Sequence, residues 1–262
     1  APESAPGGAL DLQIADWLQS LLPDGRPRRL ARMYSPGAGD KYRDVAKSES
    51  LSPAKLFNHA RGLETWAATL DLDGLTRIGA GDVDEATPEA GRAALLARYS
   101  DIRRAGLQAI AVHINNPLGE HYGGHIFGFY TDFCDAGDVA AHWRGLLPDV
   151  KEIWPCNQVI RLPFGKHKWA DSRGELWYLD DAGELHTWQL DIADQRAAAL
   201  AAVQALPLNG APPKAVSNPD RTQIENAGSA KPQPYVKTHS PRLAGRQNAA
   251  EVIARFNRAN PD

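Results

Sequence analysis

Cysteine is scarce in this sequence, long apolar runs are missing, and neither sign of charge is in clear excess. Only Cys134 and Cys156 occur among 262 residues, in neither a CxxC pair nor the spacing of a disulfide framework. This usage is typical of a reducing compartment, so we expect a cytoplasmic protein. No apolar run approaches the roughly 18 residues that a bilayer-spanning helix needs, and the N-terminal residues lack a signal-peptide pattern. We therefore expect no membrane partner.

The overall composition sets few limits on partners. A formal net charge of -3 gives no basic field, so any contact with nucleic acid would depend on local patches. The apolar fraction of 43% is enough for the core of one large domain, with or without an appendage. The chain begins without Met and ends directly after a helix-like stretch, so we expect it to be part of a longer polypeptide with further domains.

The first 64 residues are expected to form an N-terminal α/β extension. Apolar residues at helical spacing predict a helix over residues 10–22, which ends at a Pro-Asp-Gly turn. Residues 26–50 are basic and polar without a clear period. They fit a surface segment and part of a nucleic-acid path equally well.

From residue 65 the pattern changes to a core that we expect to extend to about residue 190. Runs over residues 66–70 and 75–80 flank a turn and predict a hairpin that ends in two acids. Thr87-Pro88-Glu89 predicts the start of a helix that closes at Gly106. The elements predicted next are strands over 107–114 and 125–130, a helix over 138–146, and short strands over 150–154 and 158–162. The order from residue 75 is that of the split βαβ arrangement, so the predicted fold class is α+β with a ferredoxin-like, RRM-like core.

The remaining residues complete this domain and then leave it. A hairpin over residues 175–190 and an Ala-rich helix over 193–206 are expected to close a domain of residues 1–206. Residues 207–245 are rich in Pro, Asn, Ser, Gly and Lys, which predicts a linker or a loosely packed arm. Residues 246–262 are expected to begin a further helical segment.

Chemically capable residues gather at one edge of the predicted sheet. In a split βαβ sheet the first strand lies between the third and the fourth and runs antiparallel to both. Asp82 and Asp84 end the first strand and project from one face, His125 opens the third strand, and Glu152 lies near the start of the fourth. Mg²⁺ and Mn²⁺ prefer carboxylate oxygen and keep waters or phosphate oxygens as other ligands. The cluster therefore predicts a site for two divalent metal ions and a nucleoside triphosphate, with phosphoryl transfer as the chemistry.

Ordinary structural roles remain open for each of these residues taken alone. The pair Asp71 and Asp73 has the same spacing as Asp82 and Asp84, but it precedes Gly74 and is better explained as part of a turn. A strand histidine more often packs in a core, and a lone strand glutamate more often faces solvent. Position in the predicted topology is what favours a shared site.

A basic segment follows the strand predicted over residues 158–162. Arg161, Lys166, His167 and Lys168 come to a strand end and a loop. Arginine matches the geometry of phosphate and lysine supplies a point charge, so the segment is a candidate clamp for a triphosphate or a template. A solvated basic loop is the alternative.

At these residues the chain resembles the catalytic module of archaeo-eukaryotic primases, especially bacterial, phage and conflict-system primase-polymerases. The resemblance covers roughly residues 55–190 and depends on the order and spacing of its motifs. The matching stretches are NHARG at 58–62, GDVDE at 81–85, HYGGHIFGFY at 121–130 and EIWPCNQVIRLPFGKH at 152–167.

The resemblance implies a DNA primase-polymerase that joins NTPs or dNTPs on a primer and a single-stranded DNA template. It implies two Mg²⁺ or Mn²⁺ ions as cofactors, and it leaves the preference between NTPs and dNTPs open. The implied roles are metal binding and catalysis for Asp82, Asp84 and Glu152, a catalytic contact to nucleotide phosphates for His125, and nucleotide binding for Arg161, Lys166 and His167. The chain departs from the family pattern at Gly123, where a Ser is frequent, and at Glu152, where an Asp is more usual. Asp149 is therefore a second candidate for the third acid.

Three other interpretations remain. A noncatalytic RRM-like module for single-stranded nucleic acid would use Phe127, Phe129 and Tyr130 as stacking platforms. A rolling-circle nickase would use a histidine pair and a tyrosine nucleophile, for which His121, His125, Tyr122 and Tyr130 are present. A zinc site would combine the two histidines with the two cysteines, although the spacing matches no standard finger.

Overall fold

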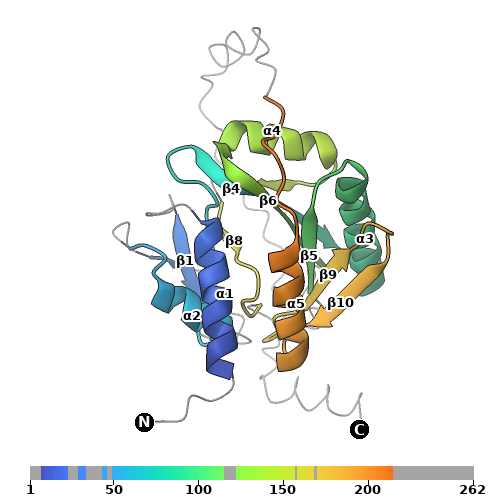
Figure 1. Ribbon diagram of the computed structural model, residues 1–262. Helices are drawn as coiled ribbons and strands as arrows, with labels where there is room; N and C mark the ends of the chain where they lie inside the picture. The colour runs from blue at the N-terminus through green and yellow to red at the C-terminus, as the bar shows by residue number, and fades with distance from the viewer. Residues whose placement is uncertain are drawn as a thin grey trace, which may run out of the picture. The chain divides into compact units, whose positions relative to one another are not determined.

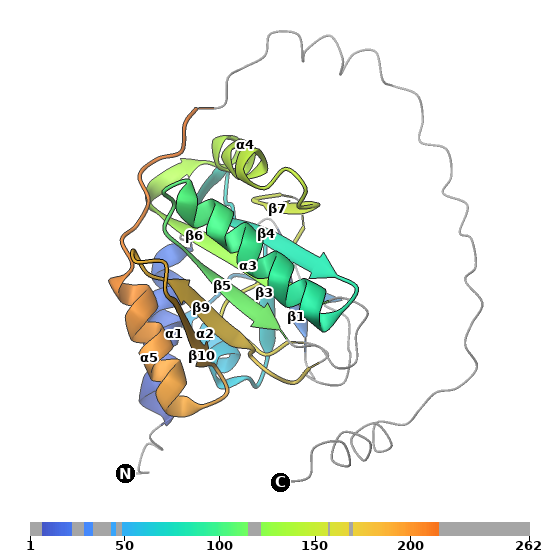
Figure 2. The ribbon, with the colours of Figure 1, turned by 90° about the vertical axis from the view of Figure 1, so that its right-hand side faces the viewer.

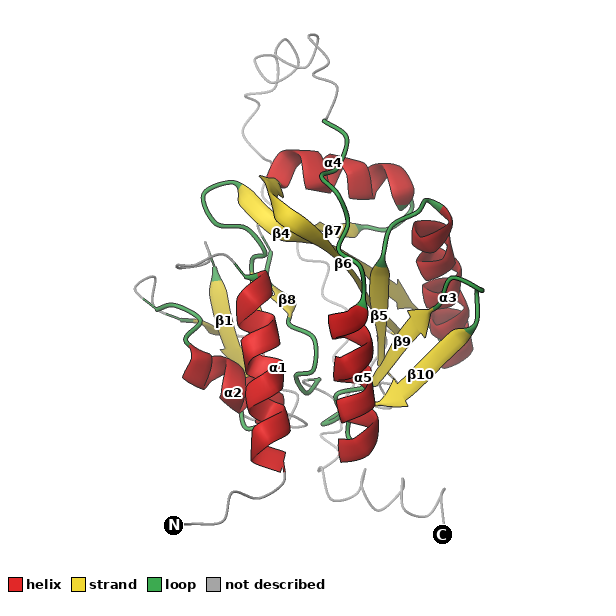
Figure 3. Cartoon of the chain, in the orientation of Figure 1, coloured by secondary structure: helices red, strands yellow, loops and turns green. Residues whose placement is uncertain are grey.

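A computed structural model describes every strand of the large sheet, which carries Asp82, Asp84, His125 and Glu152. The structure describes residues 7–22, 29–33, 43–45, 49–114, 122–156, 158–167 and 170–214. They form a mixed α+β domain within the first of two units, Ala1–Val216 (Figures 1 and 3). The second unit, Ser217–Asp262, lies outside the described residues, as does the helical segment predicted over 246–262. Among the described helices, none is both long and apolar enough to cross a bilayer.

The helices begin and end at recognisable sequence signals. Thr87 caps α3 as predicted, because its side chain accepts a hydrogen bond from the Ala90 N–H. The helix α2 was not predicted, yet Ser52 caps it in the same way and Gly62, at φ 75°, ends it. The five helices of the described ranges are α1 (Gly7–Leu21), α2 (Pro53–Arg61), α3 (Pro88–Arg104), α4 (Ala136–Leu146) and α5 (Ala193–Ala205).

The large sheet has the strand order β10-β9-β5-β6-β4-β7, and every neighbouring pair is antiparallel. The strand β4 lies between β6 and β7, as the order of elements predicted. The hairpin expected over residues 175–190 is also confirmed. The strands are β4 (Leu75–Glu85), β5 (Ala109–Ile114), β6 (Tyr122–Asp135), β7 (Glu152–Trp154), β9 (Glu175–Leu179) and β10 (Leu185–Gln189).

A second sheet corrects one predicted pairing, the hairpin of the strands over residues 66–70 and 75–80. It contains β1 (Leu30–Met33), β2 (Arg43–Asp44), β3 (Thr65–Ala68) and β8 (Ile160–Arg161), in the order β2-β1-β3-β8. The predicted hairpin of β3 with β4 is wrong, because β1 and β8 take the two edges of β3 and leave none for β4. The turn over residues 71–74 instead carries the chain from one sheet to the other. The strands β7 and β8 are likewise divided between the two sheets.

The two faces of the large sheet are covered by different helices. Figure 2 shows α3 and α4 on one side of the sheet and α1 and α5 on the other. We call these the α3–α4 side and the α1–α5 side; the second sheet and α2 belong to the latter. Alternation along β4 sends Val83 to the α3–α4 side, and Ile78 and Ala80 to the α1–α5 side. Asp82 therefore faces the α1–α5 side.

The α1–α5 side is joined by buried charges as well as apolar contacts. Arg196 of α5 pairs with Asp11 of α1 at 3.1 Å, and both side chains are under one tenth exposed. Arg196 and Arg173 also donate hydrogen bonds to the carbonyl of Ala60, near the C-terminus of α2. A guanidinium is stabilised at that position because the last carbonyls of a helix lack partners and carry partial negative charge.

The beginning of the predicted arm packs on the sheet. Asn209 accepts a backbone hydrogen bond from Thr131 and donates one to Phe129. Its side chain also bonds both backbone groups of Gln108. Residues 207–210 are therefore held by β5 and β6 rather than loosely packed, and residues 215–245 lie outside the described ranges.

Candidate active site

Three predicted site residues lie in one row across three strands. Asp82 of β4 is directly opposite His125 of β6 and directly opposite Glu152 of β7. Opposed residues of an antiparallel pair project to the same face, with Cβ atoms roughly 4.5–5.5 Å apart. The row therefore presents an imidazole and two carboxylates to the α1–α5 side at one edge of the sheet.

Asp82 and His125 are in contact. The distance from His125 Nε2 to Asp82 Oδ1 is 3.4 Å, and the two side chains are 17% and 20% exposed. The ring also meets Phe127 edge-on, at 5.8 Å between centroids. His125 Nδ1 is buried and has no hydrogen-bond partner among the described residues. The histidine is thus held in place through its Nε2 and its ring, while its Nδ1 is enclosed by the protein.

Asp84 lies next along the same face and is opposite Gly123. Gly123 has φ 150°, and a Cβ there would come within 1.8 Å of the carbonyl oxygen of Val83. A serine therefore does not fit this backbone. The result is a close approach of β6 to β4 beside the acids, where glycine is required.

The pKa of His125 lies well below its usual value of 6.5. Burial is the main cause, and the positive charges of Arg161 and of protonated His167 act in the same direction. The imidazole is consequently neutral near pH 7. It can donate one hydrogen bond and accept another, but it supplies no positive charge to a phosphate.

The donor types suit a hard cation, although the side chains are not gathered around a common point. Within the described part of the chain, no group of three or more His, Cys, Asp or Glu side chains is placed to hold a metal ion. Asp82, Asp84 and Glu152 still share one face, and the side chains of Glu152 and Asp84 are solvent-exposed. These residues would be the ones to hold Mg²⁺ or Mn²⁺, both of which prefer carboxylate oxygen.

The basic turn, which we define as residues 161–167, begins at Arg161 of β8 in the second sheet, and Arg161 and His167 act electrostatically on His125. Arg161 is 4% exposed and donates a hydrogen bond from Nη1 to the carbonyl of Gly165 at 2.5 Å. Lys166 pairs with Asp171 at 2.9 Å, and the backbone N–H of His167 donates to Ser172. Arg161 therefore stabilises the turn, and its charge is felt at His125. Lys168 lies outside the described residues.

His59 and Arg173 were given no role from the sequence, although His59 belongs to the matching stretch NHARG at 58–62. His59 is buried and contacts the basic turn, and Arg173 joins α2 to Asp191 at 3.1 Å. A signal for His59 exists, because it shares the buried stripe of α2 with Leu56 and Ala60. Arg173 has no such signal, since it lies between regular elements.

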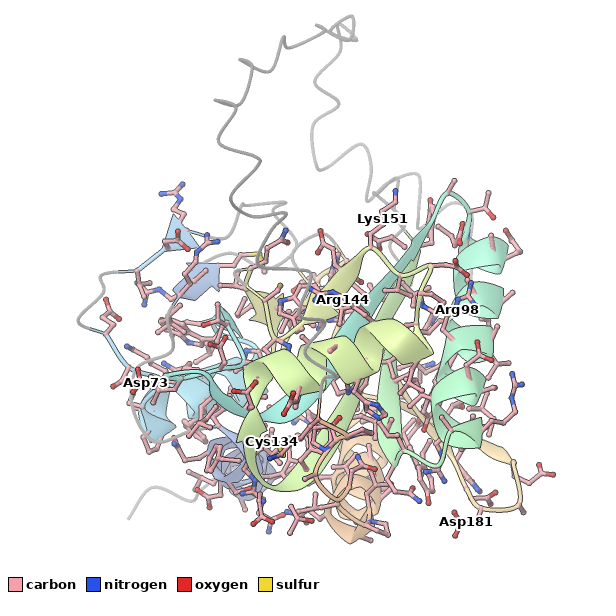
Figure 4. All side chains as sticks on the ribbon, turned by 90° about the horizontal axis from the view of Figure 1, so that it is seen from above. Asp73, Arg98, Cys134, Arg144, Lys151 and Asp181 are labelled. Atoms are coloured by element: carbon pink, nitrogen blue, oxygen red, sulfur yellow. The ribbon has the colours of Figure 1, made fainter. Side chains whose placement is uncertain are left out.

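Asp149 lies apart from the row. It pairs at 3.0 Å with Arg98 of α3, which Figure 4 labels, and its side chain is 73% exposed. Since α3 covers the α3–α4 side, Asp149 is directed away from the face that carries Asp82. Glu152 is the better-placed third acid.

The structure speaks against the residues proposed for the other interpretations. Phe127, Phe129 and Tyr130 are at most 2% exposed and are unavailable for stacking on bases. Tyr130 also accepts a hydrogen bond from Trp143 Nε1 on the α3–α4 side, so it faces away from His125. His121 lies outside the described residues.

The zinc interpretation fails on distance. His125 and Cys134 lie near opposite ends of β6, and residues of a strand advance by roughly 3.3 Å each. Figure 4 shows Cys134 and Lys151, which precedes Glu152, on opposite sides of α4. One ion cannot bind at both places.

Comparison with known proteins adds no relative. No protein-family model matches the chain, and no curated protein matches it closely enough to count as related. The residues and their geometry are therefore the basis for a function.

Proposed function

We propose that this chain is the catalytic domain of a DNA primase-polymerase, a nucleotidyltransferase that copies a single-stranded DNA template from NTPs or dNTPs. The observation that carries the proposal is the row of His125, Asp82 and Glu152 in register across β6, β4 and β7. Asp84, two residues from Asp82, extends it on the same face.

The arrangement of the core supports the same proposal. The strands β5-β6-β4-β7 follow the order of the split βαβ arrangement, and α3 and α4 pack on one face. We infer an RRM-like core, with α1, α2 and the second sheet as an extension on the catalytic face.

Each residue of the site has a proposed role. When bound, two Mg²⁺ or Mn²⁺ ions would activate the primer 3′-hydroxyl and neutralise the triphosphate. Asp82, Asp84 and Glu152 would hold them through carboxylate oxygens. The neutral His125 would donate from Nε2, on the side that faces Asp82, to a phosphate oxygen held beside that carboxylate. The basic turn would orient the triphosphate through Lys166 and His167.

The test is templated synthesis by the intact chain. Primer extension and unprimed synthesis are measured on single-stranded DNA with Mg²⁺ or Mn²⁺ and with NTPs or dNTPs. We expect metal-dependent product, and a loss on the order of 100-fold or more in the Asp82→Asn, Asp84→Asn double variant. Because neither side chain is fully buried, the melting temperature should change little.

The matched control lies at the other end of β4. Asp73 belongs to the second Asp-x-Asp pair and is exposed in the turn over residues 71–74 at φ 50°, a conformation that Asn accepts. Asp73→Asn should keep full activity. Equal product from the double variant would place the activity elsewhere. No product from a folded chain that binds DNA would indicate a binding module instead.

A further inference from the structure

His59 of α2 joins three segments of the chain through one buried ring. Its Nδ1 accepts a hydrogen bond from the backbone N–H of Trp66 at 3.0 Å. Its Nε2 lies 3.2 Å from the carbonyl oxygen of Leu162 and 3.1 Å from that of Pro163. Only the neutral tautomer with hydrogen on Nε2 satisfies both sides. Burial lowers the pKa of His59 to about 4, which keeps this tautomer at neutral pH.

The conformation of the basic turn needs such support. Phe164 has φ 67°, an unfavourable region for a bulky side chain that persists only where the surroundings impose it. Gly165 packs on the ring of His59, since a Cβ there would lie 1.9 Å from His59 Cε1. Thr65 adds a hydrogen bond from Oγ1 to the carbonyl of Lys166 at 2.9 Å.

These contacts connect α2 to the candidate active site. The turn that His59 holds carries Arg161 and His167, and both act electrostatically on His125. The carbonyls of Leu162 and Pro163 contact His59 of α2, and the carbonyl of Lys166 accepts a hydrogen bond from Thr65 of β3. A shift of the turn would therefore move the charges that act on His125.

We propose that His59 is a positioning residue, which holds the basic turn in the geometry that binds the triphosphate of the incoming nucleotide through its Nε2–H bonds to Leu162 and Pro163. The nature of the ligand depends on the proposed function; the control of the turn by His59 does not. His59 itself is buried and touches no substrate.

Two substitutions separate the two nitrogens of the ring. In His59→Asn the amide oxygen can replace Nδ1, but nothing reaches Leu162 and Pro163. In His59→Gln the amide nitrogen can replace Nε2. We expect His59→Asn to raise the KM for the nucleotide roughly tenfold with kcat changed far less, and His59→Gln to recover most of the loss. Thr65→Val, a milder change at the same turn, should raise KM roughly threefold and serves if His59→Asn does not fold.

The control is a buried hydrogen bond elsewhere. Tyr99 bonds Ala109 and Leu179 on the α3–α4 side, so Tyr99→Phe should lower the melting temperature without changing KM. If His59→Asn and Tyr99→Phe change KM equally for a similar loss of stability, His59 is only structural and the proposal is wrong.

A second readout needs no activity. Trypsin cleavage after Lys166 reports the turn directly in the intact chain without nucleotide. We expect cleavage to be roughly tenfold faster in His59→Asn, and close to the unchanged rate in His59→Gln and Tyr99→Phe. Unchanged cleavage in both His59→Asn and Thr65→Val would overturn the proposal. Faster cleavage in a protein that makes no polymer would retain the role of His59 and reject the polymerase.

Discussion

The two sides of the large sheet differ in the charge of their buried polar groups and in the partners of these groups. Under α3 and α4, Tyr99 donates to the Ala109 carbonyl and accepts from the Leu179 N–H, and Tyr130 accepts from Trp143. These are neutral groups with neutral partners. On the α1–α5 side the buried groups include charged ones, and the interior there is shared between two sheets.

The second difference is in how completely these groups are satisfied. Among the described residues, the α3–α4 side has no buried side-chain nitrogen or oxygen without a hydrogen-bond partner. On the α1–α5 side such atoms include His125 Nδ1, Arg173 Nε and Arg196 Nε. Natural proteins leave few polar atoms in this state, and they do so where binding or catalysis needs them. The comparison shows that the unsatisfied polar atoms of the described residues lie on the side that also carries the row of candidate site residues.

The largest effect on the free energy of unfolding is expected from a cavity in the core on the α3–α4 side. Trp143 is fully buried and packs directly on Gly79 and Gly128, where a Cβ would meet its ring. Trp143→Ala should lower the free energy of unfolding by about 3–5 kcal/mol, measured by urea denaturation. The folded fraction should keep its nucleotide KM at low temperature. A changed KM together with normal stability would reverse the assignment of the two sides.

One buried group on each side of the sheet should reduce stability at opposite ends of the pH scale. His59 has its pKa lowered from 6.5 to about 4, so the unfolded chain takes up a proton first as the pH falls. Stability is then lost between pH 6.5 and about 4, by about 3 kcal/mol in total. Tyr130 has its pKa raised from 10.0 to about 12 by burial, so the unfolded chain ionises first and stability is lost as the pH rises above 10.

Urea titrations across the pH range measure both limbs. His59→Gln should flatten the acid limb alone, and Tyr130→Phe the alkaline limb alone. His125, His113 and His142 also have lowered pKa values and contribute to the acid limb, so His59→Gln should leave part of the slope. Tyr99 also has a raised pKa, so Tyr130→Phe should leave part of the alkaline slope. If His59→Gln does not change the acid limb, the pKa of His59 is the same in the folded and the unfolded chain, and burial does not lower it.

Local signals predicted the α3–α4 side well. Thr87 and Pro88 fix the start of α3, and the order of elements predicts that β4 lies between β6 and β7. Once that order is known, the alignment of Asp82 with His125 and Glu152 needs only the antiparallel register. Both steps depend on patterns within a few residues and on a general rule of topology.

The α1–α5 side depends on contacts that no local pattern contains. The sequence of the turn over residues 71–74 is compatible with a hairpin and with a crossing to another sheet. The burial of β3 on both faces favours the crossing. His59 bonds carbonyls 103 and 104 residues away along the chain. From the sequence, Gly123 could be described only as the absence of a serine hydroxyl. The steric requirement for glycine is visible only in the structure, where a Cβ would collide with the carbonyl oxygen of Val83.

The variant with the smallest expected effect on stability tests whether Glu152 or Asp149 is the third acid of the site. Glu152 is exposed and opposite Asp82, so Glu152→Gln should change the free energy of unfolding by less than about 0.5 kcal/mol. It should nevertheless reduce templated synthesis on the order of 10–100-fold, because it removes a carboxylate beside Asp82. Asp149→Asn is the matched control: it breaks an exposed ion pair with Arg98 and should leave both quantities nearly unchanged. Loss of synthesis in Asp149→Asn with full activity in Glu152→Gln would mean that register does not select the third acid. In that case the chain around residue 149 would have to rearrange toward the α1–α5 side when nucleotide binds.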